Sequence, residues 1–163
     1  YNFVKKLSKI LKIKINTINK YLDFKNDFLI KKQTDIVLLL NILHHVGDDF
    51  GNKKTTIKKA KEEIIEGINY FYNKTNFLIL QIGYCWKGDK NLPLFKNGTK
   101  KEMIEFIKNG TDKKWEVAKI GIPEKNGIKI KYSYPNKNNM KRKNSFGEFL
   151  NRPIFILKSK RPC

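Results

Sequence analysis

The stretch Asp35-Ile-Val-Leu-Leu-Leu-Asn-Ile-Leu-His-His-Val46 carries the clearest structural signal in the chain. Its five consecutive apolar residues, Ile36 to Leu40, are bounded by the polar residues Asp35 and Asn41. A short apolar run of this kind predicts a strand that is buried on both faces. Such strands belong to parallel sheets that helices cover on both sides, so we expect Ile36 to Leu40 in the middle of a parallel sheet.

The rest of the chain alternates between amphipathic and strand-prone segments. Thr55 or Thr56, and later Thr99, stand where helix N-caps are expected, and Asn109-Gly110 marks the expected end of the second of these helices. Strands that alternate with helices predict an α/β fold, and the last two main strands, with no helix between them, predict an antiparallel hairpin at the sheet edge. We expect one domain over residues 1–163, with helices at 3–11, 55–72 and 99–108. The expected strands cover residues 14–22, 35–41, 77–82, 115–122, 127–134 and 153–158. Loops are expected at 23–32, 47–52 and 83–97, and a basic flap or loop at 135–147.

Charge and composition restrict the partners without identifying one. The 163 residues include 35 Lys and Arg against 15 Asp and Glu, which gives a formal net charge of +20. Such a charge favours nucleic acid or an anionic surface. Nearly all of it comes from Lys, however, whereas proteins that recognise nucleic-acid sequence use Arg for bidentate contacts. A chain rich in Lys, Asn and Ile is also typical of an AT-rich genome, so both interpretations stay open.

The sequence indicates neither a membrane span nor a disulfide framework. No segment approaches the roughly 20 apolar residues that a span requires. Cys85 and Cys163 show no pairing pattern, which favours free thiols in a reducing compartment. The chain begins at Tyr1 without a signal-peptide pattern. We therefore expect a cytoplasmic protein whose natural beginning is missing from this sequence.

The segment from Asp35 to Val46 resembles the fourth-strand motif of class I S-adenosyl-L-methionine-dependent methyltransferases, which often read Asp-x-Val-x-x-x-x-Val-Leu-His-His. Residues 76–81, 115–122 and 153–158 resemble the fifth, sixth and seventh strands of that family, and residues 83–89, 100–107 and 146–153 resemble one bacterial subgroup of it. The resemblance covers roughly residues 3–160. It implies a Rossmann-like, mostly parallel sheet with helices on both faces and a C-terminal antiparallel hairpin. It also implies methyl transfer from S-adenosyl-L-methionine to an unidentified acceptor, which is a small molecule, a glycan or RNA.

The resemblance places the site beyond the carboxyl ends of the strands. It implies cofactor contacts from Leu40, Asn41 and Ile42, mostly through backbone, and from Asp23 near the adenine. His45, and after it His44, is the candidate base for the acceptor's proton, because imidazole titrates near neutrality. The residues expected to shape the acceptor pocket are Tyr84, Trp86, Lys87 and Asp89. Each has a structural alternative: a solvated turn for Asp23, bonds to loop carbonyls for the histidines, and loop packing for the aromatic residues.

One feature of the sequence limits the methyltransferase interpretation. The Gly-rich cofactor loop of the family is not visible, since no Gly precedes Gly47, so we expect the chain to be the carboxy-terminal part of a methyltransferase domain.

His44, His45, Asp48, Asp49 and Cys85 are of the residue types that form metal clusters. Consecutive histidines nevertheless lack the i, i+4 spacing of helical metal sites, and the two Asp residues can simply cap a turn. We therefore expect no metal site.

Two other functions compete with methyl transfer. One is a metal-free ribonuclease that uses His44 and His45 as acid and base and a Lys surface for phosphates. Parallel pairing between residues 36–40 and 78–82 would count against it. The other is a non-catalytic RNA-binding domain, which needs aromatic residues on an exposed sheet face, whereas Phe77 and Trp115 are expected to be buried. The methyltransferase interpretation itself depends on residues 36–40 lying in mid-sheet.

Overall fold

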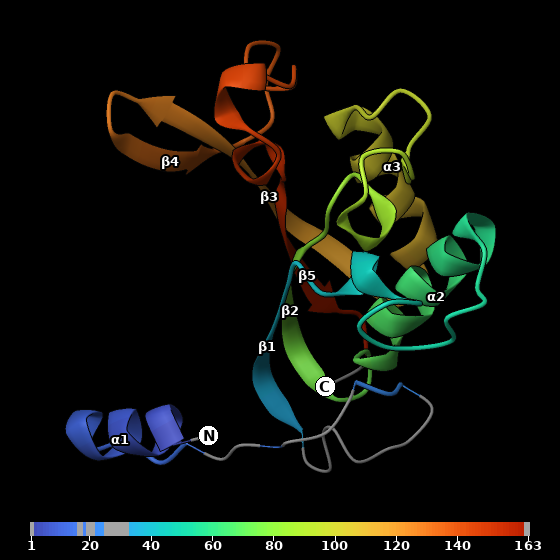
Figure 1. Cartoon of the computed structure of the whole chain (residues 1–163). Helices are drawn as coiled ribbons and strands as arrows, with labels where there is room; N and C mark the ends of the chain where they lie inside the picture. The colour runs from blue at the N-terminus through green and yellow to red at the C-terminus, as the bar shows by residue number, and fades with distance from the viewer. Residues whose placement is uncertain (1, 16–17, 19–21, 25–32, 162–163) are drawn as a thin grey trace.

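A mixed five-stranded sheet forms the centre of the computed structural model, which describes residues 2–15, 18, 22–24 and 33–161 (Figure 1). The strand order is β1-β2-β5-β3-β4. The strands are β1 Thr34–Leu40, β2 Thr75–Gln81, β3 Trp115–Asn126, β4 Lys129–Ser133 and β5 Ile154–Ser159. The α-helices are α1 Asn2–Leu11, α2 Ile57–Tyr70 and α3 Lys100–Thr111, and short 3-10 turns lie at η1 Leu43–His45, η2 Trp86–Gly88, η3 Asn144–Phe146 and η4 Phe149–Asn151.

Only one pair of neighbouring strands in the described sheet is parallel. β1 pairs with β2 in parallel, and α2 makes the crossover between them. The pairs β2–β5, β5–β3 and β3–β4 are all antiparallel. The expected Rossmann-like, mostly parallel sheet is therefore wrong. Within the described residues no α-helix follows α3, so the chain passes from β3 through β4 to β5 without the helical crossover that usually joins parallel strands.

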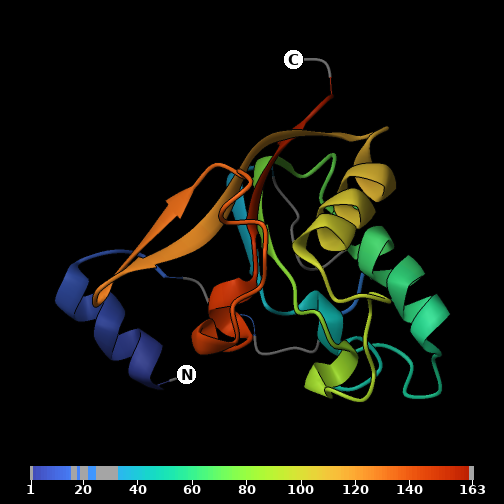
Figure 2. The same ribbon diagram turned by 90° about the horizontal axis from the view of Figure 1, so that it is seen from above.

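The helices also do not cover both faces of the sheet. Helices α2 and α3 pack side by side on one face (Figures 1 and 2). The core lies between that face and these helices, and its fully buried members include Ile64, Ile68, Leu78, Leu80, Met103, Ile107, Phe155 and Leu157. Helix α1 lies on the other side, where Phe3 and Ile10 are 74% and 75% exposed and Val4 and Leu7 are half-buried.

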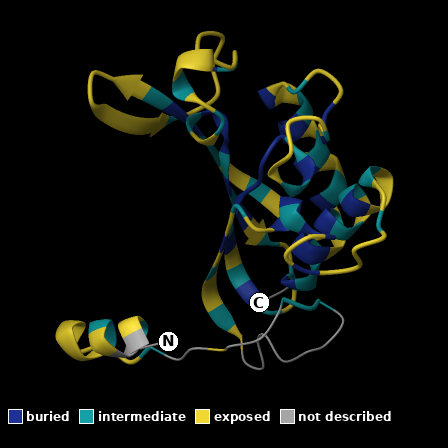
Figure 3. Cartoon of the chain, viewed as in Figure 1, coloured by how far each residue is buried: buried dark blue, intermediate teal, exposed yellow. Residues whose placement is uncertain are grey.

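Strand β1 lies at the edge of the sheet, and one of its faces is exposed (Figure 3). Ile36, Leu38 and Leu40 are 56%, 62% and 40% exposed, whereas Leu39 is 4% exposed. The prediction of a mid-sheet strand buried on both faces is therefore wrong. Successive side chains of a strand point to opposite faces, so an apolar run also fits a strand with one buried face and one uncovered apolar face. The uncovered face continues onto β2 at Phe77.

The local signals for the helix starts are confirmed. The Thr56 side chain accepts a hydrogen bond from the Lys59 backbone at the start of α2. Thr99 and Glu102 form a reciprocal capping box at the start of α3. The expected end of α3 at Asn109-Gly110 is wrong, since the helix continues to Thr111.

The remaining elements differ from expectation mainly in length and position. Strand β3 runs past residue 122 into a hairpin with β4, and this confirms the weaker strand expected after Gly127. The strand expected at 14–22 is not present in its described residues, and residues 16–17, 19–21 and 25–32 of that strand and of the following loop lie outside the described part of the chain.

The segment 135–147 is anchored to α3. Lys100 is 1% exposed, and its Nζ donates to the carbonyl oxygens of Asn139 and Lys141 at 2.8 and 3.3 Å. Burial, followed by the positive charges of Lys143 and Arg142, lowers the pKa of Lys100. These contacts fix the middle of the segment against the fold, although its Lys side chains face solvent.

Candidate functional site

The carboxyl ends of β1 and β2 lie side by side, because the two strands are parallel and Leu40 is in register with Gln81. Asn41 follows β1, and its backbone N–H donates to the Gln81 carbonyl at 2.8 Å. Asn41 has a φ of 58°, in the left-handed region that Asn tolerates better than most residues. This left-handed residue ends β1 and turns the chain out of the sheet towards η1.

A closed set of side-chain hydrogen bonds joins the two strand ends to the start of β5. Asn41 Nδ2 donates to Gln81 Oε1 at 2.7 Å, and Gln81 Nε2 donates to the Arg152 carbonyl at 3.1 Å. Arg152 Nη1 donates back to Asn41 Oδ1 at 2.7 Å, and its Nη2 donates to Glu148 Oε1 at 2.7 Å. We call Asn41, Gln81, Glu148 and Arg152 the strand-end network.

The strand-end network is largely buried, so its hydrogen bonds matter for the stability of the fold. Gln81 is 3% exposed and Arg152 is 9% exposed. A buried guanidinium requires a charged partner and further acceptors. Asn41 and Glu148 accept from its Nη1 and Nη2, while its Nε has no partner among the described residues. Removal of one partner would leave a buried polar group unpaired, so the network holds the ends of β1 and β2 in one arrangement.

The residues expected to contact the cofactor around Asn41 are placed at this edge, but not in a closed pocket. Leu40 and Ile42 are 40% and 39% exposed. Both polar atoms of the Asn41 side chain are bonded to Gln81 and Arg152, so the backbone is the part of residues 40–42 that remains for a ligand. Cofactor contact through that backbone stays a prediction.

Asp23 lies apart from the strand ends. It lines a hollow of about 1130 Å³ beside α2, together with Phe24 and with Asp48 and Asp49 from the turn after η1. None of the other residues expected to contact the cofactor lines this hollow. The structure therefore does not bring Asp23 together with the residues around Asn41.

His44 is a core residue. It is 1% exposed, and its ring packs so closely on Gly83 that a methyl group added to Gly83 would lie 2.6 Å from His44 Cδ2. Burial, followed by the positive charges of His45 and Arg152, lowers the pKa of His44 to about 3. A neutral imidazole enclosed in this way cannot exchange a proton with an acceptor in solvent, so the geometry favours a structural role.

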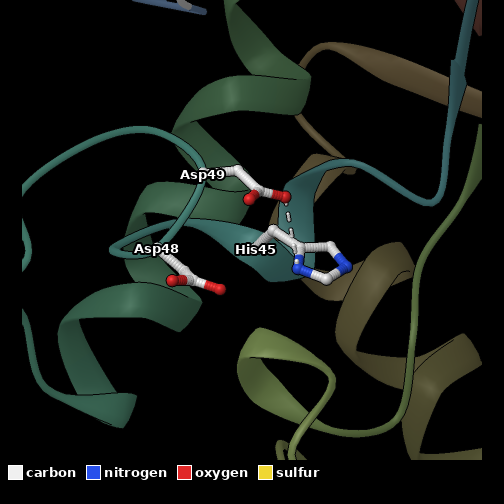
Figure 4. Close-up of side chains that lie close together, drawn as sticks. All are labelled: His45, Asp48 and Asp49. Atoms are coloured by element: carbon white, nitrogen blue, oxygen red, sulfur yellow. Dashed lines mark ion pairs between the residues drawn. The ribbon is translucent and has the colours of Figure 1, made fainter.

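His45 lies beside Asp48 and Asp49 in the turn that follows η1 (Figure 4). Its Nδ1 is 3.5 Å from Asp49 Oδ2, and the potential metal-ligand atoms of the three residues all lie within 4.8 Å of one another. His44 and Cys85 are not part of this group. The structure thus brings together three of the five residues that the sequence offered as a metal cluster.

Tyr84 and Trp86 support the loop after β2 from the inside. Tyr84 is 1% exposed, its hydroxyl donates to the Asn151 carbonyl at 2.9 Å, and the Arg142 guanidinium lies 4.1 Å from its ring centroid. Burial raises the pKa of Tyr84. Trp86 is 6% exposed, and its Nε1 donates to the Val46 carbonyl at 2.6 Å. These contacts favour loop packing over the expected role in an acceptor pocket.

Lys87 and Asp89 lie at the outer side of the same loop. Lys87 has a φ of 55°, and its Nζ lies 4.3 Å from the Trp86 ring centroid. Asp89 is exposed, and its Oδ1 accepts a hydrogen bond from the Asn91 backbone at 2.8 Å. Their expected contact with an acceptor stays a prediction.

Three members of the strand-end network were not expected from the sequence. Gln81 carried a signal, since it is a polar residue at the end of an apolar strand. Arg152 carried another, because it is one of only three Arg in a chain rich in Lys. Glu148 carried none.

Comparison of the chain with protein-family models, with curated proteins and with solved structures finds no match. Within the described ranges, no helix has both the length and the apolar character needed to cross a bilayer.

The geometry weighs against the ribonuclease but not against the RNA-binding domain. The parallel pairing of β1 with β2 is the arrangement that counts against the ribonuclease, and the lowered pKa of His44 removes one of its two acid–base groups. For the RNA-binding domain, Trp115 is 1% exposed, as expected, but Phe77 is 37% exposed and its expected burial is wrong. Its neighbours on that face, Ile36 and Leu38, are aliphatic, but Tyr132 on β4 is 47% exposed, so the RNA-binding alternative stays a prediction.

Proposed function

We propose that the chain binds S-adenosyl-L-methionine at the carboxyl ends of β1 and β2 and takes part in transfer of its methyl group to an acceptor. The observation that carries the proposal is the strand-end network, which lies directly after the β1 segment that resembles the methyltransferase motif. Ligands of sheets with parallel strands bind beyond the carboxyl ends of those strands.

The fit to the cofactor is partial. The mid-sheet position of residues 36–40, on which the resemblance depends, is not found, because β1 lies at the edge of the described sheet with one face exposed. The proposal is therefore supported by the strand ends alone. Residues 40–42 are exposed or half-buried at the strand ends, although the Asn41 N–H and the Ile42 carbonyl are already bonded to Gln81 and His45. The printed sequence has no glycine before Gly47, so residues 1–46 supply no Gly-rich loop. Asp23, which was expected near the adenine, lines a different hollow. The proposal therefore assigns only the methionine side of the cofactor to the strand ends.

The contribution of this chain to the reaction is positioning. The bound sulfonium supplies both the methyl group and the leaving group, so the protein's task is to hold the reactants in line and to exclude water. A network in which Arg152 is buried and paired with both Glu148 and Asn41 gives the strand ends the rigidity that this requires. His44 is given no proton-transfer role, because it is enclosed. The proposal includes a cytoplasmic location, which is supported by the lack of a pairing pattern between Cys85 and Cys163 in the sequence.

Calorimetric titration with S-adenosylhomocysteine tests the proposal. We expect saturable binding to the folded chain and about a tenfold weaker affinity for Asn41→Gly, which removes the amide but tolerates the left-handed backbone. The matched control is Asn126→Gly in the exposed β3–β4 hairpin, which should bind like the unmodified chain. Absence of saturable binding to a chain that melts cooperatively would overturn the proposal.

A further inference from the structure

The turn after η1 places three ligand-type side chains on one side of the chain. The backbone N–H groups of Asp48 and Asp49 both donate to the His45 carbonyl, at 3.0 and 3.1 Å. The chain turns sharply here, since Val46 is extended (φ −57°, ψ 133°) and Gly47 has a φ of 83°. This turn brings Asp48 and Asp49 back beside His45 at the end of η1. Consecutive histidines argue against a metal site, but His45 finds its partners further along the chain rather than in His44.

The turn is held from beneath by buried residues. Leu43 and Val46 are 1% and 2% exposed, and the Val46 carbonyl accepts the hydrogen bond from Trp86 Nε1. The backbone that carries His45, Asp48 and Asp49 is therefore fixed, while the two carboxylates are exposed and free to rotate. Metal sites need this combination of a fixed scaffold and accessible ligands.

The spacing of the ligand atoms fits a shared ion better than a direct contact. His45 Nδ1 is buried as an atom and has no hydrogen-bond partner among the described residues. Its distance of 3.5 Å to Asp49 Oδ2 exceeds the usual hydrogen-bond range of about 2.7–3.2 Å. Two ligand atoms that each lie about 2.1 Å from one tetrahedral ion are separated by about 3.4 Å. The observed separation thus leaves room for an ion between the imidazole and the carboxylate.

The charge around this turn is a second, independent observation. Among the described residues, the hollow that Asp48 and Asp49 line is also lined by Asp23, Glu63 and Glu66, against the cations Lys53, Lys59 and Lys114. In a chain with 35 basic and 15 acidic residues, this is a local excess of negative charge. The surface that faces the turn therefore attracts cations in a protein that otherwise repels them.

The geometry points to a divalent transition-metal site formed by His45 Nδ1, Asp48 and Asp49. One imidazole nitrogen and two carboxylates are ligands that Zn²⁺ and its neighbours Co²⁺ and Ni²⁺ accept, whereas Mg²⁺ and Ca²⁺ prefer oxygen ligands alone. Three protein ligands leave a coordination position for water or for a ligand from solution. The site involves no member of the strand-end network, and it assigns His45, the candidate base of the sequence analysis, to a metal ion instead.

The test is calorimetric titration of the full chain with Zn²⁺ and with Co²⁺, after treatment with a chelator and dialysis. We expect one ion per chain, with visible Co²⁺ absorption bands that report bound ligands. Affinity should fall at least about tenfold in Asp49→Asn and further in His45→Ala. The matched control Asp89→Asn alters an exposed carboxylate of the neighbouring loop and should bind like the unmodified chain.

Three outcomes would overturn the site. The first is absence of stoichiometric binding to the folded chain. The second is binding that survives in the double variant H45A/D49N but disappears in Cys85→Ser, which would place the ion on the nearby thiol. The third is Mg²⁺ binding as tight as Zn²⁺ binding, which would exclude a site that depends on imidazole. Each readout is independent of S-adenosylhomocysteine binding, so failure here and failure of the proposed function are distinguishable.

Discussion

Replacement of Asn41 tests the strand-end network in two ways at once. Asn41→Ala removes the hydrogen bonds to Gln81 Oε1 and from Arg152 Nη1, and it places a Cβ-bearing residue without a polar side chain at a φ of 58°. Asn41→Gly removes the same bonds but adopts that backbone conformation readily. The two variants therefore separate the energy of the network from the energy of the backbone.

The structure gives the expected sizes. A neutral side-chain hydrogen bond contributes about 1 kcal/mol, and one to a charged group contributes about 2 kcal/mol, so Asn41→Gly should lower the free energy of unfolding by about 3 kcal/mol. Asn41→Ala should lose about 1 kcal/mol more, because a left-handed backbone is costly for Ala. The loss is a large part of the stability of a typical domain.

Urea denaturation followed by tryptophan fluorescence measures both values. Trp86 and Trp115 are 6% and 1% exposed, so their emission should change when the core opens. The account requires Asn41→Gly to be the more stable of the two variants. If Asn41→Ala is at least as stable as Asn41→Gly, the left-handed backbone is refuted. If both variants lose less than about 1 kcal/mol, the buried network is refuted.

Three further predictions concern the core, the pH dependence and a helix cap. In the same urea experiment, Leu39→Ala should lower the free energy of unfolding by about 2–5 kcal/mol, because Leu39 is buried. Leu38→Ala should lower it by less than about 1 kcal/mol, because Leu38 lies on the uncovered face of β1. Equal losses would contradict that uncovered face. The folded pKa of His44 lies below the unfolded value of 6.5, so the unfolded state binds the proton first as the pH falls. The free energy of unfolding should therefore be unaffected above pH 6.5. It should fall by up to about 1.4 kcal/mol per pH unit as the pH drops towards 3. His44→Gln should flatten that slope, and an unchanged slope would show that another group causes it. Thr99→Ala should lower the melting temperature more than Thr56→Ala, since only Thr99 belongs to a reciprocal capping box worth about 1 kcal/mol or more; the reverse order would contradict the cap geometry.

The sequence predicted the local elements well, because their signals lie within a few residues. Thr56 and Thr99 each bond to a residue three positions further on, and such caps are legible in the sequence. The apolar segments of β1 and β2 were placed within two residues of their observed bounds. The end of α3 was missed, since Thr111 continues the helix past Asn109-Gly110 with a hydroxyl bond to the Ile107 carbonyl.

The fold class could not be read in the same way, because strand direction and face coverage depend on distant parts of the chain. The antiparallel pairing of residues 115–122 with residues 153–158 was expected and is confirmed for β3 and β5. The expected position of that pair at the sheet edge is wrong, because β5 lies between β2 and β3, and no local pattern in residues 154–159 specifies that position. The residues Ile36 to Leu40 look alike whether or not a helix covers them. Only the three-dimensional structure shows that α2 and α3 share one face and leave the other apolar.

The candidate functional site could be predicted only in part, because its contacts also depend on distant parts of the chain. Asn41 was expected at the strand end, but its partners Gln81 and Arg152 lie 40 and 111 residues away. Tyr84 and Trp86 were expected around an acceptor, yet the hydrogen bonds to Asn151 and Val46 draw both rings into the core. Side-chain direction after a strand is decided by such tertiary contacts, which a single sequence does not display.

The most direct test of cofactor binding at the strand ends is a backbone-amide NMR titration with S-adenosylhomocysteine. The account predicts chemical-shift changes that saturate and are largest at Asn41, Ile42 and Gln81, next to the strand-end network. A spectrum that does not change, or one whose largest saturating changes fall at Asp48 and Asp49 instead, would contradict it.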